Sequence, residues 1–553
     1  MSESVPEITP ATRAASGEQG VFRRTASGLT REISGIEHWI YNVFTLLVLT
    51  GAAFFYVWAP GQFPATNPIL GVVVAGVALI PIFMAYSLIA SAMPRSGGDY
   101  IFQSRVLHPS IGFMAMMAQV IWLWYWLELT GFWIAAMVLS PTFSLLGVYT
   151  NSAALLSLGT WFSGSSGILL TALITNIFVA LVFLPGLKNY LRWQWFLFAA
   201  VVVALLVMTF MLLTTSNAEF IANFNAFMIK FDPAQTNYYQ FVIDTANANG
   251  FNPTAGGGIY GIIGVVAIAW FNLLCANWSM INLGEIKHAN SYSRVNRIQQ
   301  ASVAFGVLVM GGTMALLFHV LGRDFTLALG YTWFNDLIAF PVAPFTSVLV
   351  PIMGGGAIVV ILILFGFLCQ AFQQSLNCLV GGTRLIVAMS MDRLLPDGLG
   401  KISRRFRGSP VNAIIFLILG AEVLAFILWF VPNLETYALS TSMTTALYAG
   451  LSCLAAALFP YRAKAIYNSS PITKYKLGGL PLITVVGALG FVECLIVIGF
   501  YLFEKNLGLA SSPGLIGMLA VYVLTFVWFW ATRAQNKRKG IDVDLNFKTI
   551  PPE

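Results

Sequence analysis

Charged residues are scarce in this sequence. Lysine, arginine, aspartate and glutamate make up only 9% of its 553 residues, whereas hydrophobic residues make up 58%. Soluble domains carry about 25% charged and 45 to 50% apolar residues, so this composition excludes a soluble globular protein. Disorder is excluded as well, because disordered chains have few aromatic residues and 14% of the residues here are aromatic. We therefore expect an integral membrane protein.

Histidine and cysteine are also few, and neither is arranged as a metal site. The four histidines are dispersed and show no HExxH spacing. The five cysteines all lie in or beside apolar segments without a CxxC pair, and an odd number of scattered thiols gives no disulfide framework. We expect buried cysteines, no bound metal and no catalytic cluster, so an enzyme is not predicted.

Long apolar runs fill most of the chain. A transmembrane helix needs about 20 mostly apolar residues, and the sequence contains about twelve such runs. Their approximate limits are 39–59, 69–92, 111–139, 166–186, 191–214, 259–283, 298–322, 353–379, 411–430, 436–459, 480–503 and 512–533. The sequence therefore predicts an all-α protein with about 12 transmembrane helices.

The basic residues indicate how these spans are oriented. Of the 29 lysines and arginines, all but Lys230, Arg323 and Lys505 fall in the N-terminal tail, in every second loop or in the C-terminal tail. Because lysine and arginine accumulate in cytoplasmic loops, we expect a multi-pass protein of the cell membrane with both termini in the cytoplasm. The net charge of +7 is then explained by topology and by contact with the lipid bilayer, without a nucleic acid partner.

Two spans carry small or polar residues at mid-length. Span one contains Thr50, Gly51, Ala52 and Ala53, and span six contains Asn272. Such residues allow a helix to unwind where protein or water satisfies the backbone, although small residues also serve close packing. Because span six follows span one by five positions, two five-helix units would have opposite orientations, as in many secondary transporters.

This arrangement predicts a division of the chain. It gives a cytoplasmic tail at 1–38, a first five-helix repeat at 39–214, an extracellular loop at 215–258, a second, inverted repeat at 259–459, two accessory helices at 460–533 and a cytoplasmic tail at 534–553.

The directions of the two interrupted spans predict the ligand. The outer half of span one would begin with free N–H groups at its positive dipole end, which attracts a carboxylate. The first half of span six would end in free carbonyls, which suit an ammonium group. A small α-amino acid carries both groups. The candidate binding residues are Thr50, Gly51, Ala52, Ala53, Trp270, Phe271, Asn272, Leu273 and Leu274.

A few polar residues lie inside other spans, where lipid exposure would be costly. Glu128 in span three is either a cavity carboxylate that binds a proton or a cationic substrate, or a structural hydrogen-bond partner of a neighbouring helix. In span eight, Gln370, Gln373 and Gln374 share one helical face. We expect them to face the protein interior. There they would line the permeation path, hold an ion or form hydrogen bonds with other helices, and the sequence leaves these alternatives open.

Several loops resemble those of the amino acid-polyamine-organocation (APC) permeases. Met93 to Tyr100 resembles their P-x-S-G-G-x-Y loop, and Gly284 to Lys287 is similar to their E-x-K-N-P turn, without its asparagine and proline. Arg384 to Pro396 resembles the R-x-x-x-A-M-x-x-D-x-x-L-P segment. The residues that carry these matches and are predicted to gate or support the structure are Pro94, Arg95, Gly97, Gly98, Tyr100, Glu285, Arg384, Asp392 and Pro396.

The resemblance extends over about residues 30–535 and implies a LeuT-like core of five plus five helices with two added C-terminal helices. It implies a secondary-active permease that moves amino acids by alternating access, as an ion-coupled symporter or as an exchanging antiporter, with a proton or sodium as the only possible cofactor. A carrier of polyamines or other organic cations, or a non-transporting amino acid sensor, is the alternative. Cys275 or Asn272 replaces the family's glycine in span six, so Cys275 joins the candidates.

Overall fold

The computed structural model describes residues 31–430, 438–504 and 512–550. Within these residues twelve helices are long and apolar enough to cross a membrane, which confirms the predicted all-α, twelve-span fold. Residues 1–30 of the predicted N-terminal tail lie outside the described part of the chain.

The spans follow one another in chain order, and three of them consist of more than one helical segment. They are α1 and α2 (Gly35–Thr45, Thr50–Gln62), α3 (Pro68–Ala92), α5, η1 and α6 (Pro109–Ile134, Ala135–Leu139, Ser140–Thr150), α8 (Ser165–Phe183), α9 (Leu187–Thr214), α12 and η2 (Gly258–Leu274, Cys275–Glu285), α13 (Tyr292–Leu321), α16 (Gly356–Met391), α17 (Val411–Trp429), α18 (Ala438–Arg462), α20 (Leu482–Phe503) and α21 (Ser512–Arg538).

Shorter elements connect the spans. They are α4 (Gly98–Val106), α7 (Ala153–Ser163), α10 (Asn217–Met228), α11 (Tyr238–Ala248), α14 (Arg323–Phe334), α15 (Thr346–Leu349), η3 (Pro351–Met353), α19 (Lys464–Ser469), the antiparallel strands β1 (Lys476–Leu477) and β2 (Leu480–Pro481), and η6 (Val543–Lys548). The predicted extracellular loop at 215–258 thus contains two helices, α10 and α11.

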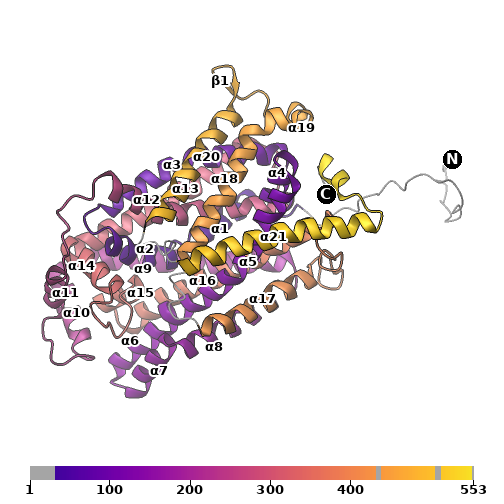
Figure 1. The fold of residues 1–553 in the computed structure, drawn as a ribbon. Coiled ribbons are helices and arrows are strands. Elements are labelled where there is room, and N and C mark those ends of the chain that lie inside the picture. Colours follow the sequence, from indigo (N-terminus) through magenta and orange to yellow (C-terminus); the bar gives the residue numbers. More distant parts are fainter. Residues whose placement is uncertain (1–30, 431–437, 505–511, 551–553) are drawn as a thin grey trace, which may run out of the picture.

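The connecting helices mark the two ends of the bundle. Figure 1 shows α10, α11 and α14 gathered at one end, while α4 and the C-terminal end of α21 lie at the other. We call these the α14 end and the α4 end. The centre of the bundle is formed around α16, which packs against α5, α9 and η2. The last two spans are peripheral: α20 packs against α18 and α3, and α21 against α5.

Several predicted span limits differ from the structure, among them the end of span three, which lies at Thr150 rather than at residue 139. Two of the differences have a clear local cause. Span one begins at Gly35 rather than at residue 39, because Ser34 and Glu37 form a capping box that satisfies the first N–H groups of α1. Span eight continues to Met391 rather than ending near residue 379. Its last turns, which contain Arg384, stay helical because Arg384 is paired in the protein interior, so Arg384 lies in a helix and not in a loop.

The cysteines are where the sequence places them. All five are free and buried, which agrees with their expected role as core residues.

Candidate functional site

Span one is interrupted by four residues between α1 and α2. Leu47 lies in this turn with φ of 55°, a left-handed conformation that leucine rarely adopts. The interruption was predicted at Thr50 to Ala53, with the outer half of the span beginning near Gly51 to Ala53. The outer half, α2, begins at Thr50, close to that position. The non-helical turn itself covers residues 46–49, so it lies one helical turn earlier than the small residues suggest.

The first turn of α2 has two free backbone donors. Ala52 and Ala53 donate their N–H groups to the carbonyls of Leu47 and Leu49, at 3.0 and 2.8 Å, and are therefore occupied. Within the described residues the N–H groups of Thr50 and Gly51 have no hydrogen-bond partner. The Thr50 hydroxyl is fully buried and also lacks one. These donors stand at the positive end of the α2 dipole.

Gln370 of α16 forms hydrogen bonds with the backbone on both sides of the break in span one. Its Oε1 accepts from the Leu49 N–H at 3.0 Å, and its Nε2 donates to the Phe44 carbonyl at 3.2 Å. One amide side chain thus satisfies one backbone group of the turn and one of the last turn of α1. A buried backbone group without a partner is costly, so Gln370 stabilises the interruption itself.

Span six changes its helix type where an unwound segment was expected. α12 ends at Leu274, within the range Trp270 to Leu274 predicted for the end of its first half, but the chain passes directly into the 3₁₀ helix η2 at Cys275 without an unwound gap. A change from i→i+4 to i→i+3 bonding shifts the hydrogen-bond register and leaves a carbonyl of the last α turn without its ordinary donor. Asn272 joins the two spans, since its Nδ2 donates to the Gly51 carbonyl at 3.3 Å.

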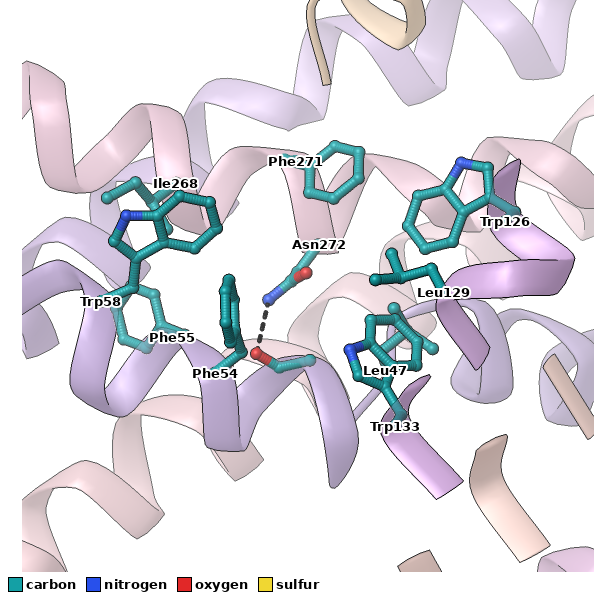
Figure 2. Close-up of a pocket in the computed structure, with 11 residues that line it drawn as sticks. Leu47, Phe54, Phe55, Trp58, Trp126, Leu129, Trp133, Ile268, Phe271 and Asn272 are labelled. Carbon is teal, nitrogen blue, oxygen red and sulfur yellow. Dashed lines mark hydrogen bonds between the residues drawn. The ribbon is translucent and has the colours of Figure 1, made fainter. Parts of the chain in front are cut away.

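A small, almost entirely apolar cavity of about 30 Å³ lies beside this junction, which is room for about two water molecules. Figure 2 shows Asn272 at its centre, with Trp58 and Phe54 on one side and Trp126 on the other. The dashed line marks the hydrogen bond of Asn272 to the Gly51 carbonyl. The cavity is lined by Leu47, Gly51, Phe54, Phe55, Trp58, Trp126, Leu129, Trp133, Ile268, Phe271 and Asn272.

Three of the predicted binding residues line this cavity, namely Gly51, Phe271 and Asn272. The others predicted are not among its lining residues: Thr50, Ala52, Ala53, Trp270, Leu273, Leu274 and Cys275. Sequence reasoning missed the aromatic wall of the cavity, which is formed by Phe54, Phe55, Trp58, Trp126, Trp133 and Phe271. A signal for it exists in span three, where Trp126, Leu129 and Trp133 recur at i, i+3 and i+7 on one helical face.

Glu128, which precedes the lining residue Leu129, and Glu493, which contacts Trp270, are both engaged in other contacts. Glu128 accepts from Asn176 Nδ2 of α8 at 2.8 Å and is not among the lining residues, although its neighbour Leu129 is. Glu493 of α20 accepts from the Trp270 indole N–H at 2.6 Å. Trp270 thus turns its polar atom away from the site towards span eleven.

The polar face of α16 lies in the interior, as its spacing predicts. Gln370, Gln373, Gln374 and Asn377 are all buried. Gln373 donates to Asn377 Oδ1 at 3.0 Å, whereas both amide atoms of Gln374 lack a partner within the described residues. None of these side chains lines the cavity.

The predicted loop residues pair with one another at the α4 end. Arg384 donates two hydrogen bonds to Glu285, at 2.6 and 2.7 Å, and both side chains are almost fully buried. This bidentate pair joins α16 to Glu285, the last residue of η2, which follows the candidate site along span six. Such charge-assisted pairs are strong and geometrically specific.

A second pair joins the α4 segment to the residue that follows α16. Arg105 and Asp392 form a fully buried ion pair at 2.7 Å, and the Tyr100 hydroxyl donates to Asp392 at 2.7 Å. The Phe547 ring of η6 covers Arg105, with 4.9 Å from the guanidinium carbon to the ring centroid. Two distant sequence motifs therefore form one cluster.

The glycine pair before α4 allows this segment to dock on span six. Gly97 has φ of 95° and donates its N–H to the Ile281 carbonyl at 2.8 Å. A Cβ on Gly98 would lie 2.3 Å from the Met280 carbonyl oxygen, so no side chain fits there. The neighbouring motif residues Pro94 and Arg95 contact each other, Arg95 Nη1 donating to the Pro94 carbonyl, and Pro396 lies in the turn after α16.

Comparison with known proteins agrees with this architecture. The family model described as Amino acid permease matches residues 347–542, a stretch that includes α16, its polar face and the Arg384 to Pro396 segment. No curated protein matches the chain. The resemblance found in the loop motifs is thereby confirmed. Over residues 347–542 the chain is therefore similar to the amino acid permeases of the APC superfamily, a family whose members are transporters and not enzymes.

Proposed function

We propose that the chain is a secondary-active transporter that carries α-amino acids across the cell membrane by alternating access. The observation that supports this proposal best is the pair of free N–H groups of Thr50 and Gly51 beside an enclosed cavity, at the start of a helix within the bundle. Buried donors of this kind need a hydrogen-bond partner, and a carboxylate at the start of a helix supplies one.

The two helix ends give the site its polarity. The positive end of α2 and its free donors suit the carboxylate of an amino acid. The negative end of α12, where the bonding register shifts, suits the ammonium group. Asn272 and the Gly51 carbonyl join the two ends at 3.3 Å, so both groups of one α-carbon can be bound across this short distance.

Alternating access requires a barrier on each side of the site. Towards the α14 end, the cavity is covered by Trp58 and Phe54, which contact Phe334 and Trp333 of α14. Towards the α4 end, the Arg384–Glu285 and Arg105–Asp392 pairs hold η2, α4 and α16 together. We propose that the two barriers open in turn, and that the α4 end faces the cytoplasm, because the basic loops lie there.

The proposal is tested by uptake into liposomes that contain the purified protein. A labelled mixture of amino acids is offered with an inward proton gradient, with an inward sodium gradient, or with unlabelled amino acids inside. Saturable accumulation under one of these conditions, and counterflow of label when the protein is preloaded, is the expected result. Failure under all three conditions would overturn the proposal, and uptake without saturation or counterflow would indicate a channel.

A further inference from the structure

The chemistry of the cavity wall carries an inference about the substrate. Six of the eleven lining residues are aromatic and three are leucine or isoleucine, while the remaining two are Gly51 and Asn272. No aspartate, glutamate, lysine or arginine is among them. The only amide, that of Asn272, is bound to the Gly51 carbonyl.

The nearby charges do not compensate for this lack. Glu128 points to Asn176, and Glu493 is bound to the Trp270 indole. A charged substrate side chain in this cavity would therefore be buried without a partner, which costs several kcal/mol. An uncharged amide would lose its hydrogen bonds with water and find no replacement.

The aromatic rings are also fixed against one another. Trp126 stacks on Phe271 with ring centroids 5.6 Å apart, and it meets Trp133 and Trp278 edge to face. Such pairs add to the burial energy of each ring. The wall thus offers a preformed apolar surface on the side of the junction opposite to Phe54 and Trp58.

We infer that the substrate is an amino acid with an uncharged, apolar side chain, which packs against this wall while its carboxylate and ammonium groups bind the two helix ends. This inference rests on the proposed function and narrows it. It excludes amino acids with acidic, basic or amide side chains, and it excludes polyamines, which would bring several positive charges to a wall without an acid.

Leucine and asparagine form the matched test pair, because they share the α-carbon groups and a similar branched shape. Purified protein is titrated with each amino acid in a thermal-shift assay, and each is used to compete with labelled leucine in liposomes. We expect leucine to bind about 5- to 150-fold more tightly than asparagine, since an unpaired buried amide costs about 1–3 kcal/mol. Lysine, glutamate and putrescine are expected not to compete.

A variant of the wall gives a second measurement. Leu129→Asn places an amide in the cavity and is expected to reduce the preference for leucine over asparagine, whereas Leu129→Met keeps an apolar side chain of similar size and is expected to retain it. If Leu129→Asn does not fold, the ratio of the leucine and asparagine affinities of the unchanged protein still tests the inference.

The outcomes separate the two proposals. If asparagine, lysine or glutamate binds as tightly as leucine, the inference fails while amino acid transport stands. If no amino acid binds, the proposed function fails with it. If tetramethylammonium or putrescine binds and amino acids do not, the aromatic wall recognises a cation through its ring faces, and both proposals are overturned.

Discussion

The break in span one depends on a single side chain, and this dependence can be measured. Gln370→Met removes the hydrogen bonds to the Leu49 N–H and the Phe44 carbonyl and fills a similar volume with an unbranched apolar chain. The Phe44 carbonyl keeps the Leu47 N–H as a donor at 3.1 Å, so only the Leu49 N–H is left without a partner. A buried backbone group without a partner costs about 1–3 kcal/mol, which is a sizeable part of a typical stability of about 5–15 kcal/mol.

The chain supplies a matched control one helical turn further on. Gln374 is equally buried, but both of its amide atoms lack a partner within the described residues. Gln374→Met therefore removes an unpaired buried amide and should leave stability unchanged or raise it. Thermal unfolding of both variants, followed by tryptophan fluorescence in the same lipid, gives the comparison. A Gln370→Met variant that melts no lower than Gln374→Met would refute the reasoning.

Three further predictions concern Gly51, Glu128 and Asp99, a buried residue of α4 that accepts from the hydroxyls of Tyr86 and Ser452. Gly51→Ala places a Cβ 2.7 Å from the Leu47 Cβ, so it should push the break apart and lower amino acid affinity at least about tenfold in a binding titration; wild-type affinity would contradict this. Glu128→Gln keeps an acceptor for Asn176 but removes the charge, so if Glu128 carries a coupling proton, uptake against a gradient is lost and exchange is retained; unchanged uphill uptake would exclude that role. Burial raises the pKa of Asp99 from 3.8 to about 6, so the contribution of Asp99 to stability falls by about 3 kcal/mol as the pH rises across this interval. The melting temperature of Asp99→Asn should therefore rise relative to that of the wild type from pH 4 to pH 6, and the difference should then level off. A pH-independent difference would contradict this prediction.

The sequence predicts the twelve spans because hydropathy over some 20 residues reports a physical requirement of the bilayer. It also identifies three of the four residues of the two buried ion pairs, because Glu285, Arg384 and Asp392 belong to recognisable loop motifs; Arg105 is not among its candidates. It cannot reveal which residues contact one another. Asp392, for example, contacts Tyr100 and Arg105, which lie far from it in the chain.

The position of the break illustrates what local composition cannot predict. Gly51 suggests unwinding at its own position, yet the left-handed residue is Leu47. A leucine adopts this conformation only because Gln370, distant in sequence, satisfies the backbone around it. The aromatic wall was missed for a related reason: rings at helical spacing occur in every packed membrane helix, and only the fold shows which of them surround a cavity.

The Gln370 contact also bears on how this protein is made. The Leu49 N–H and Gln370 are 321 residues apart, and at a synthesis rate of about 5–20 residues per second span eight emerges roughly 15 to 65 s after span one. During this interval the turn at residues 46–49 has no Gln370 to bond its backbone. Since hydrocarbon offers no substitute, the first span must be held by water or by the insertion machinery, and substitutions at Gln370 should be detected as failures of biogenesis before any loss of transport is seen.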